Sequence, residues 1–401
     1  MRALSRRSFL LGAAPAAAAA VLPERRGAKV PSRAAQFRDA LTERPLWRLT
    51  DPGVLHHLPH YHHRFISQRR NFLLVASELS GTRQIYRMNL PDGDMVQLTT
   101  GPGVHSYSPT LDPDDRTMFL LQENELKSVA VGNGREAVIY RSPRDWRMTG
   151  HLSVSQDGAY AALVEMLEQH WSGDAEKQFP RPHCRLRVVD LKTKRDRLAV
   201  DGRRWLTHPQ FRPGTTDILY RHEGPADEVN DRLQLTSVDG KRKRNLRTRS
   251  GEERFGHEYW QPDGAAVCYV HYPDVSGRGA TVRVLDIETA EERVLSRCTR
   301  FGWLTGNGDN SVIAGASLSL ASPNIYVLFS GLRREMTVCE HLSSGRAYPV
   351  AGTEFVDAFA SSPEPVFSPD SRWIYFVSDR EGQPTVYRTD VSDLVENTSN
   401  G

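Results

Sequence analysis

The strongest constraint on the fold is a motif that recurs along the chain: a hydrophobic residue, a short turn rich in Pro, Asp or Gly, and then a strand-like run. Examples are 'PTLDPDDRTMFLLQ', 'YWQPDGAAVCYVHY' and 'PVFSPDSRWIYFVSD'. The motif occurs in seven copies, and the hydrophobic residues that begin them, here called anchors, are Phe65, Leu111, Val154, Phe211, Trp260, Leu304 and Phe367. Their spacing is comparable with the ~40–50 residues of β-propeller repeats.

Each repeat continues with further strand-like runs, such as 'TVRVLDI' followed by 'ERVLS'. Four short antiparallel strands in each unit make one propeller blade. We therefore predict an all-β chain that folds into a seven-bladed β-propeller with four-stranded antiparallel blades. A pair of β-sandwiches would also show short strands and Gly/Asp turns, but the seven-fold spacing argues against that fold.

The two ends of the chain are expected to meet in one blade, because a closed ring leaves no exposed sheet edge. The stretch 'WRLTDPG' before the first anchor echoes 'VQLTTGPG' before the second. We therefore predict that Trp47 to Thr50 form the outer strand of the last blade. The propeller is predicted to span residues 46–392, preceded by a linker over residues 24–45 and followed by a disordered tail over residues 393–401.

The N-terminal stretch 'MRALSRRSFLLGAAPAAAAAVLP' has a paired arginine, a short apolar run and small residues suited to cleavage. Its 'SRRSFLL' resembles a twin-arginine signal, centred on Arg6 and Arg7. Residues 10–22 lack the amphipathic pattern of a buried helix, and the run is short for a membrane span. Residues 1–23 are therefore predicted to be a signal peptide that exports a folded protein, which would be periplasmic or secreted and free of the membrane after cleavage.

The charge balance argues against a nucleic-acid partner. The chain has 52 basic and 49 acidic residues, a formal net charge of +3, and no long block of one sign. The four cysteines lie far apart without CxxC spacing, which argues against a zinc site built from cysteines. Composition and spacing do not determine the oligomeric state.

Polar residues next to the anchors are the first candidates for a functional site, because loops from several blades converge there. His208 and His257 each lie three residues before an anchor, Glu364 has the same offset in the last blade, and His62 has it in the first. Such a set can hold a metal or supply a base, although each residue could instead satisfy the backbone of its own blade. His62 is a plausible substrate contact, whereas His60 and the other histidines of 'VLHHLPHYHHRF' are predicted to be loop residues.

The segments 'CRLRVVDLKT', 'THPQFRP', 'HEGP' and 'HEYWQPDG' resemble the oligogalacturonate lyase family, over a likeness that runs from about Trp47 to Arg388. The resemblance implies a seven-bladed propeller that cleaves short pectin fragments by β-elimination. In that reaction a base removes the C5 proton of a galacturonate, and the glycosidic oxygen leaves from C4. Negative charge builds on the carboxylate, and fixed cations stabilise it best.

The resemblance also assigns roles to individual residues. It places the base on His208, the assisting arginine on Arg185 and a metal-binding histidine on His257. The family holds manganese with histidines and a glutamine. In 'RHEGPADEVNDRL', His222 and Arg232 become candidates for contact with an anionic oligosaccharide such as oligogalacturonate.

The chain departs from the family pattern in the last blade. Its 'AFASSPEPVFSPD' has Ser362 and Glu364 where the family has two histidines around a proline, and the upstream glutamine is absent. A carboxylate can bind manganese, so His257 and Glu364 predict a weakened metal site. Three hypotheses follow: an exported lyase of this family, a lyase that uses Arg185 and another basic group instead of a metal, and a periplasmic propeller that binds a sugar or a protein without turnover.

Overall fold

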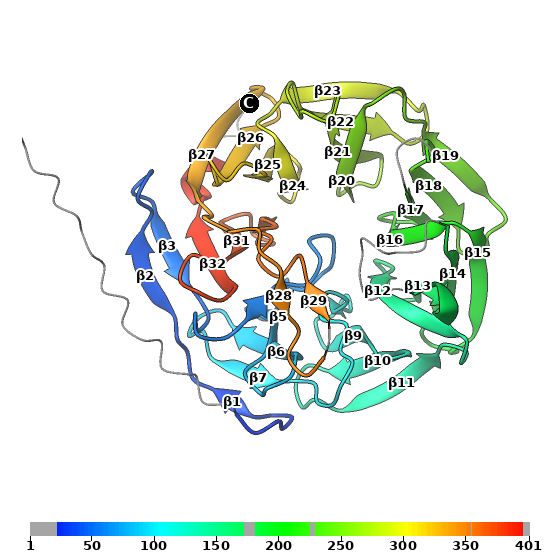
Figure 1. Ribbon diagram of the computed structural model, residues 1–401, viewed down its shortest axis with the longest axis horizontal. Helices are drawn as coiled ribbons and strands as arrows, with labels where there is room; N and C mark the ends of the chain where they lie inside the picture. The colour runs from blue at the N-terminus through cyan, green and yellow to red at the C-terminus, as the bar shows by residue number, and fades with distance from the viewer. Residues whose placement is uncertain (1–21, 172–180, 225–228, 354, 396–401) are drawn as a thin grey trace, which may run out of the picture.

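The computed structural model describes residues 22–171, 181–224, 229–353 and 355–395. These residues form seven antiparallel sheets of four or five strands, arranged as a ring around a central axis (Figure 1). The prediction of a seven-bladed β-propeller is therefore confirmed. In each blade the innermost strand faces the axis, and the chain runs outward through the following strands before it enters the next blade.

Blade 1 contains, from the axis outward, β4 (His56–His57), β5 (Phe72–Ser77), β6 (Gln84–Asn89), β7 (Met95–Gln97) and β1 (Lys29–Val30). Blade 2 contains β8 (Thr110–Leu111), β9 (Thr117–Gln122), β10 (Glu125–Ala130) and β11 (Glu136–Arg141). Blade 3 contains β12 (Trp146–Val154), β13 (Tyr160–Leu167), β14 (His183–Asp190) and β15 (Asp196–Arg203). Blade 4 contains β16 (Trp205–Phe211), β17 (Asp217–Glu223), β18 (Leu233–Ser237) and β19 (Lys243–Arg247).

Blade 5 contains β20 (Arg254–Trp260), β21 (Ala266–Tyr272), β22 (Thr281–Asp286) and β23 (Glu292–Arg297). Blade 6 contains β24 (Phe301–Gly306), β25 (Val312–Ser317), β26 (Asn324–Phe329) and β27 (Arg334–Glu340). Blade 7 contains β30 (Val366–Phe367), β31 (Trp373–Ser378), β32 (Thr385–Asp390), β3 (Pro45–Arg48) and β2 (Ala35–Arg38). A two-stranded hairpin, β28 (Tyr348–Pro349) and β29 (Val356–Asp357), lies between blades 6 and 7 in the sequence.

The ring is closed by an N-terminal strand, as the sequence predicted. In blade 7, Leu46 of β3 pairs with Thr389 of β32, and the next residue of β3 pairs with Arg388. The closing strand is the fourth and not the outermost of its blade, because β2 pairs with the outer side of β3. The closure thus consists of two N-terminal strands added to a sheet from the C-terminal end of the chain.

The prediction of a linker over residues 24–45 was wrong, since this segment contains two edge strands. Strand β1 extends blade 1 by pairing with β7, and β2 extends blade 7. Apolar residues at intervals make this possible: Val30 is buried, and the ring of Phe37 packs edge-on against Tyr387 with centroids 6.2 Å apart. The two short strands thereby cover polar backbone at the outer edges of their blades.

The predicted terminal segments are only partly described. The signal peptide prediction falls almost entirely on residues 1–21, outside the described residues. At the other end, the first residues of the predicted tail belong to a short helix, α1 (Ser392–Val395), and Asp393 pairs with Arg44 at 2.8 Å. No helix in the described ranges is long and apolar enough to cross a membrane.

The hydrophobic core is shared between neighbouring blades. One cluster joins Leu46 of the closing strand to Ile374 and Tyr387 of blade 7 and to Val312 and Ile325 of blade 6. Each sheet is buried on both faces by the sheets beside it, so a blade depends on its neighbours for much of its burial.

Replacement of the buried Leu46 by alanine should therefore weaken the whole ring. Leu46 is fully buried, and a leucine-to-alanine change at such a site costs about 2–5 kcal/mol of unfolding free energy. Chemical denaturation of the purified protein would measure the loss. The control is Leu41→Ala, because Leu41 is 57% exposed in the same N-terminal region and should change stability by less than ~0.5 kcal/mol. Equal effects of the two substitutions would contradict the role of the closing strand.

Candidate active site

The innermost strands of three consecutive blades are interrupted by β-bulges at matching positions. The pairing register shifts in all three strands: between Met148 and Leu152 in β12, between Thr207 and Gln210 in β16, and between Gly256 and Tyr259 in β20. A bulge leaves residues unpaired and turns a side chain away from its regular direction. In each of these strands, the residue that lies three positions before the anchor falls within the bulge. The bulge therefore releases this residue towards the axis.

The backbone at these positions is unusual. The φ angles of His208, His257 and Glu364 are +47°, +58° and +29°, in the left-handed region that side chains rarely adopt. Such conformations persist only where surrounding structure holds them, and they cluster at functional sites. The three-residue offset in the sequence therefore marks a real structural equivalence between blades 4, 5 and 7.

Blade 1 supplies its residues differently. Its innermost strand stops at His57 and pairs again only at Ile66, which bridges to Leu73, so the residues between leave the sheet. The Nε2–H of His63 donates a hydrogen bond to the carbonyl of Leu152 in blade 3 (2.6 Å). This segment of blade 1 is thereby anchored to blade 3, and its histidines lie at the bulges of blades 3 and 4.

Four histidines meet at this point, and we refer to His60, His62, His151 and His208 as the histidine cluster. The ring centroids of His151 and His208 lie 4.6 Å apart, and the His60 ring lies 5.2 Å from that of His208. The His62 ring lies 5.3 Å from that of His60 and 6.0 Å from that of His208. All four side chains are half-buried. The structure thus brings together two predicted site residues, His208 and His62.

The other two members of the cluster were not predicted from the sequence. His151 lies three residues before the anchor Val154, so the same offset that singled out His208 would have found it. His60 was predicted to be a loop residue, and it does lie outside the strands, but its loop in blade 1 places its ring beside that of His208. No local pattern in 'VLHHLPHYHHRF' reveals that interruption.

A buried arginine next to the cluster was also missed. Arg221 lies on β17 opposite Thr207, forms an ion pair with Glu258 of blade 5, and donates a hydrogen bond from Nη2 to the hydroxyl of Tyr61 (2.9 Å). Tyr61 in turn donates to the carbonyl of Glu258 (3.0 Å). These contacts connect blades 1, 4 and 5 and hold a permanent positive charge beside the imidazoles.

Arg232 belongs to the same ionic network. It forms an ion pair with Glu223, and its Nε lies 3.3 Å from Oε1 of Glu258. Two arginines and two glutamates therefore alternate behind the cluster, with formal charges that cancel. His222, the other predicted substrate contact in this stretch, has its Nδ1 2.8 Å from Oδ1 of Asp231. Both residues are thus engaged in protein contacts, while Pro225 to Glu228 of the quoted stretch lie outside the described residues.

The imidazoles of the cluster are neutral at neutral pH. Burial, the charge of Arg221 and the other imidazoles hold the pKa of His208 well below its usual value, and burial with the charge of Arg221 lowers the pKa of His151 to about 3. The Nδ1 atoms of all four cluster histidines are buried without a hydrogen-bond partner in the described structure. Neutral imidazoles with unpaired nitrogens can accept a proton or bind a metal.

Arg185, the predicted assisting arginine, lies farther out in blade 3. It lies near the start of β14, the third strand of the blade, and its guanidinium lies 3.5 Å from the centroid of the Trp146 ring. Its Nε lies 3.6 Å from Oδ2 of Asp201. Arg185 is half-buried in blade 3, and these contacts do not involve the histidine cluster.

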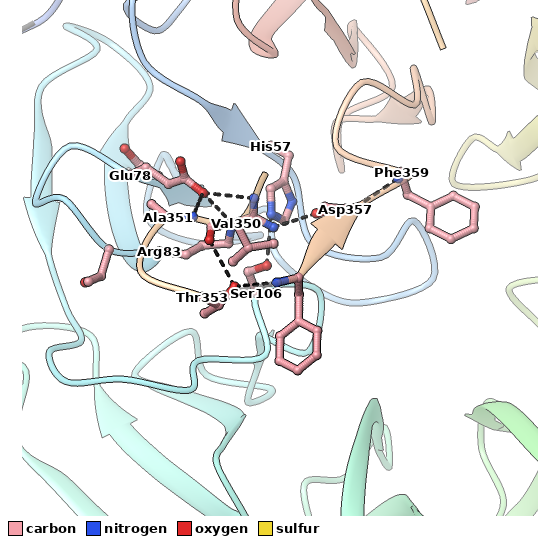
Figure 2. Close-up of polar contacts among 12 residues, drawn as sticks. His57, Glu78, Arg83, Ser106, Val350, Ala351, Thr353, Asp357 and Phe359 are labelled. Carbon is pink, nitrogen blue, oxygen red and sulfur yellow. Dashed lines mark hydrogen bonds and ion pairs between the residues drawn. The ribbon is translucent and has the colours of Figure 1, made fainter. Parts of the chain in front are cut away.

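A set of contacts beside His60 joins blade 1 to the β28–β29 hairpin. The ring of Tyr107 lies 5.3 Å from that of His60, and its hydroxyl donates to Asp357 of the β28–β29 hairpin (3.0 Å). Asp357 also pairs with Arg83 of blade 1, and Figure 2 shows this buried contact with the aromatic ring of Phe359 turned away from it. The hairpin is therefore fastened to blade 1 next to the histidine cluster.

Comparison with known proteins accounts for this architecture. A sequence model of the oligogalacturonate lyase family matches residues 25–395. The chain belongs to the oligogalacturonate lyase family. This confirms the family predicted from the sequence motifs, and with it the prediction of a lyase.

Individual relatives agree over nearly the whole chain. An oligogalacturonide lyase of Pectobacterium atrosepticum is 28% identical over 394 residues, which cover 93% of this chain and 100% of that protein. An oligogalacturonate lyase of Dickeya dadantii is 28% identical over 383 residues, covering 90% and 96%. A solved oligogalacturonate lyase in complex with manganese superposes with a TM-score of 0.86 at 29% identity, covering 92% of this chain and 99% of that one.

His257 and Glu364, the predicted metal ligands, do not belong to a group of three converging ligand side chains in the described residues. The His257 ring lies 5.9 Å from that of Trp303 and 6.4 Å from that of Tyr61, and burial and the charges of Arg221 and Arg232 lower its pKa to about 3. Within the described residues, the only three histidine, cysteine or carboxylate side chains whose ligand atoms converge belong to the histidine cluster. The predicted pair thus lacks a third such ligand.

Glu364 leads to a pH prediction. Burial and the charge of Asp357 raise its pKa from 4.5 to about 8, so between these values the folded protein holds a proton that the unfolded chain has lost. The free energy of unfolding should therefore fall as the pH rises from 4.5 to 8. Glu364→Gln cannot ionise, and at about pH 9 it should be more stable than the unsubstituted protein by on the order of 1 kcal/mol.

Denaturation curves at several pH values would measure this difference. The control is Glu291→Gln, which changes an exposed glutamate and should leave the pH dependence as it is. A Glu364→Gln variant with the same pH profile as the unsubstituted protein would show that Glu364 is ionised in the folded state at neutral pH.

Proposed function

We propose that this chain cleaves oligogalacturonate, or a closely related short uronate oligomer, by β-elimination at the histidine cluster. The observation that carries the proposal is the convergence of neutral imidazoles beside a buried guanidinium in a member of the oligogalacturonate lyase family. β-Elimination needs a base for the C5 proton and a positive charge for the uronate carboxylate. The site contains both groups. The reaction itself needs no water nucleophile.

His208 is the proposed base. It is half-buried, its imidazole is neutral, and its Nδ1 has no hydrogen-bond partner in the described structure. The bulge of β16 and the positive φ angle turn its side chain out of the sheet. A neutral imidazole at the axis can take the C5 proton and pass it to the leaving oxygen or to water.

Two arginines are proposed to stabilise the carboxylate. Arg221 holds its charge close to the histidine cluster, although one side of its guanidinium is occupied by Glu258. Arg185, placed by the family motif, has a guanidinium stacked on Trp146 and offers a second cation on blade 3. A guanidinium can bind a carboxylate with two parallel hydrogen bonds, and no step of this proposal passes through a metal.

The cellular location is part of the proposal. The twin-arginine-type stretch around Arg6 and Arg7 supports export of the folded lyase to the periplasm or the outside. There it would meet uronate oligomers released from pectin. His222 and Arg232 are proposed to contact the sugar through the groups left free by their partners, and His62 from within the cluster.

His208→Ala should abolish most of the activity. Incubation of the purified protein with di- and trigalacturonate should produce an unsaturated product that absorbs in the ultraviolet. Loss of a general base lowers the rate by about 10²–10⁴-fold, and added imidazole should restore part of it if the missing group is a proton acceptor. A variant that keeps its rate would remove His208 from the role of base.

The control for this experiment is His341→Ala. His341 is also a buried histidine, but it follows the outer strand β27 and its Nε2 lies 3.2 Å from the carbonyl of Ser317. It should lose stability without a specific loss of rate in the folded fraction. No product from either uronate with the unsubstituted protein would overturn the proposed substrate.

A pair of conservative substitutions would separate the roles of the two arginines. Lysine keeps the charge but cannot bind a carboxylate through two parallel bonds. Arg221→Lys should lower kcat/KM by at least about tenfold through kcat, because its charge lies beside the base. Arg185→Lys should act mainly on KM. Equal kinetics for Arg221→Lys and the unsubstituted protein would leave Arg221 with only a structural role.

A further inference from the structure

Three members of the histidine cluster have the geometry of a metal centre. One ring nitrogen from each of His60, His151 and His208 lies within 4.8 Å of the others. His151 and His208 lie on the innermost strands of blades 3 and 4, and His60 lies on the segment that follows β4 in blade 1, so the closed ring brings the three residues together. Three histidine ligands with an open fourth position are a common arrangement for zinc in proteins.

Each of the three histidines has one buried ring nitrogen without a hydrogen-bond partner. The Nδ1 atoms of His60, His151 and His208 are buried and form no hydrogen bond in the described structure. An unpaired buried polar atom costs free energy, and each such atom in a native protein calls for an explanation. Three of them in one place, on residues from three blades, are explained together if they bind a common ligand.

Local charge permits a cation here. Arg221 lies near the cluster, but it is paired with Glu258, and Arg232 is paired with Glu223 and Glu258. The two positive and two negative formal charges of this network cancel. A divalent ion among the imidazoles therefore meets no net positive charge from the residues behind it.

We propose that His60, His151 and His208 bind a zinc-type divalent cation, at a place different from the position implied by the manganese site of the family. Neutral imidazole favours zinc, nickel and copper, whereas manganese prefers carboxylate and carbonyl oxygen. No carboxylate belongs to the three-histidine group. Zinc is thus the expected occupant, and manganese should bind more weakly.

Occupancy of this centre has a consequence that rests on the proposed function. A nitrogen of His208 that binds zinc is blocked for proton transfer, and the charge of the ion disfavours protonation of the ring. The same imidazole therefore cannot be a zinc ligand and the base at once. Zinc should inhibit the elimination reaction, and its removal by a chelator should restore the rate.

The binding experiment uses the intact exported protein after dialysis against a chelator. Titration with Zn²⁺ in a calorimeter, and with Co²⁺ followed by visible absorption, should show one ion per chain. His151→Ala should weaken Zn²⁺ binding by at least about tenfold, because it removes one of three protein ligands. Circular dichroism would establish that the variant is folded.

Two matched variants make this test specific. His62→Ala changes a cluster histidine outside the three-ligand group, and His257→Ala changes the position implied by the family. Both should keep the stoichiometry and most of the affinity for Zn²⁺. Absence of Zn²⁺ binding, or loss of binding in His257→Ala but not in His151→Ala, would overturn the proposed centre.

Activity measured with and without Zn²⁺ separates this centre from the proposed reaction. For each protein, the rate with Zn²⁺ is divided by the rate without it. If zinc lowers this ratio in the unsubstituted protein but not in His151→Ala, the result supports both the centre and His208 as base. Zinc binding at the three histidines without inhibition would keep the centre and overturn its consequence for His208. A protein that binds zinc but makes no product would fail only the proposed function.

Discussion

The pairing of β3 with β32 is the interaction on which the rest of the structure depends. Blades 1 and 7 come from opposite ends of the chain, and this antiparallel ladder turns a row of seven sheets into a ring. Only in a closed ring do the innermost strands of all blades face a single axis. The excursion of blade 1 can then reach blade 3, where His63 bonds to Leu152.

The site arises where regular strand geometry is given up. Bulges in β12 and β16 and the broken innermost strand of blade 1 release His151, His208 and His60 from their sheets. A regular strand would send these side chains into the neighbouring blades, because alternate residues point to opposite faces of a sheet. His208 has a left-handed backbone, a conformation that persists only where the surrounding structure holds it.

The electrostatics of the site come from pairing across blades. Glu258 of blade 5 forms ion pairs with Arg221 and Arg232 of blade 4, so a buried guanidinium can remain beside neutral imidazoles. A buried charge without such a partner would cost several kcal/mol. The same network gives Arg232, a predicted substrate contact, its protein partners Glu223 and Glu258.

The seven blades, the closure by an N-terminal strand and the family could be predicted from the sequence alone, because the repeat and the motifs are local patterns of residues. His208 could also be singled out, since its fixed offset from the anchor can be read along the sequence. The positions of His60 and Arg221 beside His208, and the edge strands within residues 24–45, became clear only from the folded structure. Those contacts join segments from different blades, and their partners are set by ring closure and bulges that no local pattern encodes.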